Sequence, residues 1–250
     1  MPRFTPFRLA AVCALALITT LAFVAGASAK GFSAQLRVVG SGGKTLFEKP
    51  VATATTTLKT SPNAKCFGPG NEGSGEAVTI PGNSALGLLA RGSATSGALR
   101  PLTLTDAFDF GLGLCGVGSS VAKGAASWYL KVNHKAPSLG GEKVKIKPGD
   151  EVLWALVKTV PPKYEYPDEL VLAAPAKAQP GAPFSVRVWG YDGKGKRTPV
   201  AGARVTGAAP TGKDGRTMVT LAKPAQLAAS DGADIPSARV AVCVGGKCPR

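Results

Sequence analysis

Apolar and polar residues alternate along much of the chain after residue 30, and this pattern predicts β-strands. The alternation is clear at residues 34–39 and 102–110, and a period of two is typical of strands with one buried face. Residues 51–58 form a β-branched run that favours extended structure. Residues 61–75 are rich in proline, asparagine, glycine and serine and predict a loop. A mainly β chain is therefore expected.

One segment has helical character instead. Residues 85–91 place their apolar side chains on one helical face, and Asn83 or Ser84 can cap the free backbone N–H groups at the start. Gly87 inside the segment costs about 1 kcal/mol relative to alanine. The predicted helix is therefore short.

The stretch from Ala126 to Trp154 predicts two further strands separated by a charged turn. It contains Trp128 and Trp154, two of the three tryptophans in the chain. The pattern places both side chains in one small hydrophobic core. Nothing in the stretch performs chemistry, so it is a structural signature.

The second half of the chain predicts several short strands separated by turns. They fall at residues 170–172, 183–189, 203–205, 216–221 and 238–244. Short strands at this density with few helical signals are typical of a small β-sandwich.

The first residues predict a secretory signal peptide, residues 1–29. Arg3 and Arg8 precede an uncharged apolar run at residues 9–24, and residues 27–29 offer a small-x-small cleavage site. The alternative is an uncleaved anchor, but the run is shorter than the roughly 20 residues of a spanning helix. We expect the mature chain to have no transmembrane segment and to be secreted, either free or loosely associated with the cell surface.

The cysteines of the mature chain predict two disulfides. An even number of cysteines in an exported protein favours disulfides over free thiols, although four allow three pairings. The economical pairing joins Cys66 to Cys115 and Cys243 to Cys248. Metal binding is the alternative, but neither pair has C-x-x-C spacing and His134 is the only histidine. No metal site is expected.

The chain is strongly basic, with 30 Lys and Arg against 15 Asp and Glu, and removal of the signal peptide takes away only two arginines. The excess either keeps an exported protein soluble or attracts it to an anionic envelope polymer or membrane surface. The basic residues are scattered rather than gathered in blocks. Export argues against a nucleic-acid partner.

Motifs for catalysis and cofactor binding are incomplete. Residues 111–116 spell G-x-G-x-x-G, but the helix and acidic residue of a dinucleotide site do not follow. Residues 190–197 approach a phosphate-binding loop, but Arg197 stands where a hydroxyl is required. A Ser-His-Asp hydrolase would have to use His134, but the sequence contains no G-x-S-x-G motif. We predict no catalytic residue and no cofactor.

Four aspartates lie in glycine-containing turns: Asp192, Asp214, Asp231 and Asp234. They lack the D-x-D-x-D-G pattern of a calcium loop. Solvated turns are expected.

Two motifs in the stretch from Ala126 to Trp154 carry a family resemblance. W-Y-x-x-V-N, a turn, and then P-G-D-x-V-x-W resemble the C-terminal domain of transcobalamin and intrinsic factor, and the bacterial exported family of unknown function grouped with it. The matching residues are Trp128, Tyr129, Val132, Asn133, Pro148, Gly149, Asp150, Val152 and Trp154. The resemblance covers residue 31 to about residue 160. His134 stands where relatives usually have glycine.

The resemblance implies a fold and a ligand class for the first half. In the vertebrate carriers this domain packs on cobalamin beside a helical domain, which this chain lacks. In the second half, G-A-P-F-S-V-R-V, P-V-A-G-A-R-V and K-D-G-R-T resemble bacterial immunoglobulin-like repeats. The predicted organisation is a signal peptide at 1–29, a transcobalamin-C-terminal-like α+β domain at 30–159, a proline-rich linker at 160–168 and an immunoglobulin-like β-sandwich at 169–250.

The function that these features favour is non-enzymatic: an exported bacterial protein for surface adhesion or ligand binding at the envelope. The alternative is a carrier of a small, cobalamin-like molecule. The expected partner is accordingly an anionic envelope polymer or a small-molecule ligand. The residues predicted to contact it are tyrosines with a nearby lysine and the histidine: Tyr129, Lys131, His134, Tyr164, Tyr166 and Tyr191.

Overall fold

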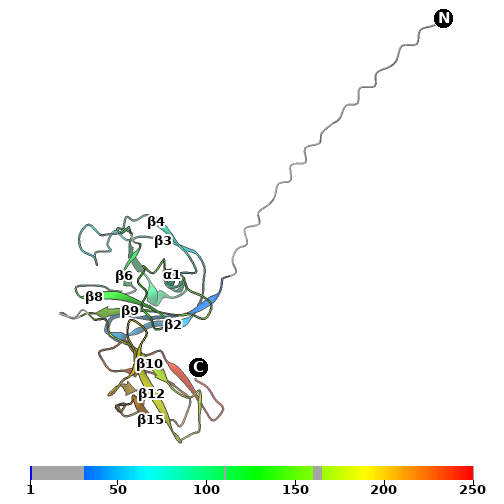
Figure 1. Cartoon of the computed structure of the whole chain (residues 1–250), viewed down its shortest axis with the longest axis vertical. Helices are drawn as coiled ribbons and strands as arrows, with labels where there is room; N and C mark the ends of the chain where they lie inside the picture. The colour runs from blue at the N-terminus through cyan, green and yellow to red at the C-terminus, as the bar shows by residue number, and fades with distance from the viewer. Residues whose placement is uncertain (2–30, 110, 160–164, 250) are drawn as a thin grey trace. The chain divides into compact units, whose positions relative to one another are not determined.

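The computed structural model describes Met1 and residues 31–109, 111–159 and 165–249 (Figure 1). Residues 31–250 form one compact unit. Residues 2–29 of the predicted signal peptide and residues 160–164 of the predicted linker lie outside the described part. The mainly β prediction is confirmed, because one α-helix and eighteen strands make up the regular structure of the described residues, with two short 3-10 turns.

The first half is built on a four-stranded sheet in the order β2-β1-β9-β8. Its members are β1 (Ser33–Val39), β2 (Thr45–Ala52), β8 (Ala126–Val132) and β9 (Glu151–Lys158). The central pair, β1 and β9, is parallel, and the two outer pairs are antiparallel.

One face of this sheet packs against α1 (Ala85–Thr95), which lies beside it in Figure 1. Ser84 begins the helix by accepting a 3.0 Å hydrogen bond from the Gly87 N–H, as one of the two predicted caps. The helix continues four residues past the predicted end. Gly92 makes this contact with the sheet close, because a Cβ atom there would lie 2.5 Å from Leu36 Cδ2.

The core between helix and sheet contains both predicted tryptophans. Trp154 is 5% exposed and its Nε1–H donates to Ala85 O at 3.3 Å, while Trp128 packs on the same cluster. The prediction of one shared core is confirmed. The predicted second strand is shorter than expected, because β9 begins at Glu151 and the lysine-rich residues before it form turns.

Two small sheets and a disulfide complete the first half. The first pairs β3 (Thr56–Lys59) with β4 (Ala77–Ile80), and the second contains β5 (Leu102–Thr105), β6 (Gly113–Val117) and β7 (Ser120–Val121). The predicted strand over residues 102–110 therefore ends early, and the glycine-rich segment after it forms a fully buried strand.

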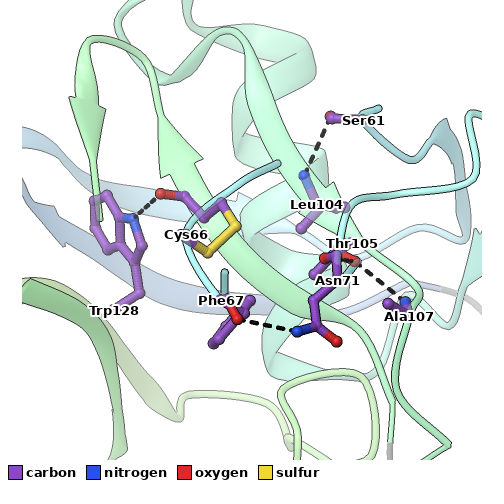
Figure 2. The surroundings of a disulfide bond; sticks show 9 residues. Ser61, Cys66, Phe67, Asn71, Leu104, Thr105, Ala107 and Trp128 are labelled. Carbon is purple, nitrogen blue, oxygen red and sulfur yellow. Dashed lines mark hydrogen bonds between the residues drawn. A yellow bond between two sulfur atoms is a disulfide. The ribbon is translucent and has the colours of Figure 1, made fainter. Parts of the chain in front are cut away.

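The predicted Cys66–Cys115 disulfide is confirmed and ties the loop before β4 to β6. Figure 2 shows its surroundings, where Trp128 Nε1–H donates to Cys115 O at 3.2 Å. In the same view Asn71 Nδ2 donates to Phe67 O at 3.0 Å. The disulfide thus anchors a long loop against the tryptophan-bearing strand.

The second half contains two facing groups of strands. In the first group, β12 (Pro183–Tyr191) pairs with β10 (Glu169–Ala173), β13 (Arg197–Pro199) and β15 (Arg216–Thr220). Along β12, buried residues alternate with more exposed ones, and the buried side chains join a second core.

The second group has the order β11-β18-β16, with β11 (Lys177–Ala178), β16 (Ala225–Leu227) and β18 (Val240–Val244). A further short pair joins β14 (Arg204–Val205), which falls between β13 and β15 in sequence, to β17 (Ala229–Ser230), which falls between β16 and β18.

The predicted Cys243–Cys248 disulfide is also confirmed and closes the turn after β18. In the described part of the chain, no helix combines the length and apolar character that a membrane span needs.

Candidate functional site

Five of the six predicted contact residues converge where the first sheet meets β10 and β12: Tyr129, Lys131, His134, Tyr166 and Tyr191. Tyr164 lies outside the described residues. Two residues that were not predicted, Arg37 and Glu169, also lie there. We use the name junction cluster for Arg37, Lys131, His134, Glu169 and Tyr191.

Glu169, the first residue of β10, is the centre of the junction cluster. Its side chain is 4% exposed, and Arg37 of β1 donates a hydrogen bond to its Oε1. Lys131 is fully buried, its Nζ lies 3.6 Å from Glu169 Oε2, and it donates to Tyr191 O at 2.7 Å. One buried carboxylate therefore compensates two buried cations that come from the other sheet.

His134 reaches the same carboxylate from a tight turn. Val132 and Lys135 exchange backbone hydrogen bonds of 2.8 and 3.1 Å across the two-residue turn Asn133-His134. Both turn residues have positive φ, 49° and 67°. Positive φ at both positions is typical of the type I′ turn, which connects the twisted strands of tight hairpins. Such a conformation favours glycine and is strained for histidine.

The strained turn places the imidazole between two acids. His134 Nδ1 lies 3.1 Å from Glu169 Oε2, within hydrogen-bond distance, and Nε2 lies 3.8 Å from Glu151 Oε2. The ring also packs on Tyr191, with centroids 4.4 Å apart. The turn is held by its neighbour, since Asn133 Nδ2 donates to Asp150 Oδ1 at 2.9 Å.

Burial and charge act in opposite directions on these groups. Burial alone would raise the pKa of Glu169, but the His134 hydrogen bond and the positive charges of Arg37 and Lys131 hold that pKa below its ordinary value. Burial lowers the pKa of Lys131, and the Glu169 carboxylate offsets this only in part. Glu169 therefore stays ionised at neutral pH.

Tyr129 extends the contact on the side of β8. Its ring stacks on Tyr166 with centroids 4.3 Å apart and planes 1° apart. Burial, followed by the neighbouring acids and Tyr166, raises the pKa of Tyr129 to about 12. Tyr129 is 8% exposed, whereas Tyr166 is 47% exposed. Only the outer ring of the pair is open to a partner.

The junction cluster is chiefly an internal contact. Alternation along β8 places Lys131 opposite the core face, which is the solvent side in an isolated sheet, but Glu169 and Tyr191 cover that side. The same face carries a small third core in which Ile235 packs on Val39 and Ala155. Because Glu169 and Tyr191 of the second half contact Arg37, Lys131 and His134 of the first half, the cluster joins the two halves of the chain.

The solvent-facing side of the β12 sheet has the opposite character. Cross-strand pairs place rows of side chains on this side: Tyr191 with Arg197, Trp189 with Pro199, and Arg187 with Arg216. We use the name Trp189 face for Arg187, Trp189, Arg197 and Arg216. Met218, in the next row, is 54% exposed.

Two guanidinium groups pack against the indole of this face. Arg187 Cζ lies 3.7 Å and Arg197 Cζ lies 4.8 Å from the centroid of the Trp189 ring, within the range of cation–π attraction. Arg187 Nε also donates to Asp214 O at 2.9 Å. Among the described residues, no carboxylate lies within ion-pair distance of either guanidinium group.

The surroundings of the Trp189 face are positive. Apart from Arg204, residues 183–220 contain six Lys and Arg against two Asp. Asp214 lies 3.5 Å from Arg216 Nε, and Asp192 accepts the Lys194 and Lys196 backbone N–H groups at 2.8 and 2.9 Å. The face can therefore attract and bind an anion, because Arg187 and Arg197 are held in position and are not neutralised by a carboxylate.

Sequence reasoning did not single out the Trp189 face, although a signal was present. Arg187, Trp189 and Tyr191 alternate along β12 and so share one side of it. Arg197 joins them only through the turn at residues 192–196, whose type the sequence indicated but whose pairing register it did not.

A cavity of about 410 Å³ lies beside the junction cluster. His134, Glu151 and Glu169 line one part of it, and Glu48 and Arg239 line another. Arg239 N–H donates to Glu48 Oε1 at 2.7 Å. The volume is that of a small-molecule site.

The aspartates in turns make backbone contacts. Asp231 Oδ1 accepts the Asp234 N–H at 2.8 Å, and Asp234 Oδ1 accepts the Asp168 N–H at 2.9 Å. Burial and the Asp231 carboxyl raise the pKa of Asp234 to about 7. In the part of the chain that the structure describes, no group of three or more His, Cys, Asp or Glu is placed to hold a metal ion.

No family model matches the sequence, and no curated protein is significantly similar to it.

Proposed function

We propose that this is a non-enzymatic, exported bacterial protein that adheres to an anionic polymer of the cell envelope through the Trp189 face. The observation that carries the proposal is the pair of guanidinium groups stacked on Trp189 without a carboxylate partner. Two disulfides in the chain agree with an oxidising compartment outside the cytoplasm.

The physical argument rests on preorganisation. An arginine that is already held against an aromatic ring loses little side-chain freedom when an anion arrives. Its N–H groups remain available for charge-assisted hydrogen bonds. The positive surroundings raise the rate of encounter with an anionic polymer.

A cosedimentation experiment tests this function. Purified anionic cell-wall glycopolymer is mixed with the full mature protein at low and at high salt. We expect binding at low salt that weakens at high salt, and loss of most binding in the double variant R187Q/R197Q.

Arg204→Gln is the matched control, because Arg204 is an exposed arginine of β14 away from the Trp189 face. It removes one positive charge from a different surface. Absence of binding at low salt would refute the proposal, and so would equal binding by the double variant and the wild type.

A second function, that of a small-molecule carrier, is favoured by the cavity of about 410 Å³ beside the junction cluster. The first half resembles the transcobalamin C-terminal domain in the sequence motifs of its two Trp-bearing strands. A corrinoid is therefore the ligand to try. The protein is incubated with a coloured corrinoid and gel-filtered; coelution supports a carrier, and its absence removes this alternative.

A further inference from the structure

The Trp189 face has a direction as well as a charge. Its cations occupy the two rows of β12 that flank the Trp189–Pro199 row, namely the Arg187–Arg216 pair and the Tyr191–Arg197 pair. Four residues of a strand span about 14 Å. The turn that follows adds Lys194 and Lys196, whose side chains are exposed. The positive groups thus form a tract along the strand rather than a single pocket.

The spacing within the tract is short. The guanidinium carbons of Arg187 and Arg197 are at most about 8.5 Å apart, the sum of 3.7 Å and 4.8 Å to the shared Trp189 ring. A ligand that contacts both groups and also the rest of the tract needs negative charges that follow one another closely along its length. The tract spans about 14 Å, more than a single small anion can contact.

The arrangement of the negative charges in the ligand also affects how well it fits the tract. In a linear phosphate polymer the charged groups are part of the backbone, so successive charges lie along one path. In an extended polypeptide, successive side chains point to opposite sides, so polyglutamate presents every second carboxylate away from the face. Guanidinium groups also match phosphate oxygens through paired N–H donors.

We propose that the Trp189 face binds a linear, phosphate-bearing polymer that runs along β12 from Arg216 over Trp189 to Arg197. This inference rests on the proposed function and specifies its ligand. Asp214 limits the affinity, because its carboxylate lies 3.5 Å from Arg216 Nε and competes with phosphate at that end of the tract.

The experiment uses inorganic polyphosphate of defined chain lengths and the full mature protein. Affinity is measured by titration calorimetry over a series of salt concentrations. We expect affinity to rise with chain length until the polymer covers the tract. The slope of log K against log salt should reach about −0.7 for each phosphate contacted.

Single variants locate the contacts. Arg187→Gln and Arg197→Gln should each weaken binding about fivefold to tenfold and reduce the slope by about 0.7. Arg204→Gln should change neither quantity. Asp214→Asn should strengthen binding about twofold or more, and it keeps the oxygen that accepts the Arg216 N–H at 3.1 Å. Because a misfolded protein does not gain affinity, this variant separates binding from stability.

The outcomes distinguish this inference from the proposed function. If the glycopolymer binds through the two arginines but polyphosphate does not, or if polyglutamate of equal charge binds as tightly, the phosphate inference is wrong and the adhesion function stands. If neither polymer binds at low salt, both are wrong. A salt slope that is the same in all variants would also overturn the inference.

Discussion

The junction cluster and the Trp189 face contain the same kinds of residue but have different roles. Both combine cations with an aromatic ring, and both include residues of β12. In the junction cluster the cations surround a buried carboxylate, whereas on the Trp189 face Arg187 and Arg197 stack on a ring and have no carboxylate within ion-pair distance. A cation with a buried internal partner stabilises the fold, and a cation held in place without one can bind a ligand.

The largest expected effect comes from breaking the internal pairing. Glu169→Gln leaves Arg37 and Lys131 buried without a negative charge, so we expect it to lower the free energy of unfolding by about 3–5 kcal/mol. Urea denaturation at pH 7 measures the change. Arg187→Gln, on the Trp189 face, is the contrast and should change stability by less than about 0.5 kcal/mol.

A double variant sharpens the same point. Replacing Lys131 by Met together with Glu169→Gln removes one of the stranded cations, so it should be less destabilising than the sum of the two single changes. If Glu169→Gln costs under about 1 kcal/mol, the junction cluster does not have the structural role assigned to it.

A smaller effect on stability is expected at the neighbouring carboxyl groups of Asp231 and Asp234. The pKa of Asp234 is raised to about 7 beside Asp231, so the folded protein holds a proton there between about pH 4 and 7 that the unfolded chain releases. Stability should therefore rise as the pH falls from 8 to 5. We expect a gain of about 1 kcal/mol, discounted because the carboxyl group is partly exposed.

The variant Asp234→Asn identifies the group responsible. It keeps an oxygen to accept the Asp168 N–H and has no titratable proton, so the rise between pH 8 and 5 should disappear. The pKa of Glu169 lies below its ordinary value, so its contribution is lost only at lower pH. If the stability of Asp234→Asn still rises between pH 8 and 5, another group is responsible for the rise.

The smallest effect concerns the turn at His134. His134→Gly relieves the strain of a positive φ but loses the contact with Glu169, so its net change should stay below about 1 kcal/mol. His134→Ala loses the contact and keeps the strain, so it should be less stable than His134→Gly by about 1 kcal/mol. Thermal unfolding of the two variants side by side measures the difference. Equal stabilities would show that the turn is not strained.

Local features of the fold were predictable because local patterns determine them. Ser84 before an apolar stripe indicated the start of the helix, and alternation indicated most strands of both halves. The glycines around Cys115 concealed β6, because glycine contributes no side chain to the alternation although Gly113 is buried in contact with Phe67.

The candidate site was harder to predict, because it depends on which surfaces meet. Lys131 alternates with Leu130 and Val132 and so has the pattern of a solvent-facing residue. Only the arrival of Glu169 from β10 buries it, and no local pattern specifies that contact. Trp189 and Arg197 likewise meet through strand register, which the sequence alone does not determine.

The parallel pairing of β1 with β9 has a consequence for how the chain is made. The first sheet has at its centre the strand that is synthesised first and the strand that is synthesised last among its four members, more than 110 residues apart. Contacts this distant in sequence form slowly, and β1 lacks its partner β9 until residue 158 has left the ribosome. The four-stranded sheet therefore cannot be completed until well over half of the chain has been synthesised.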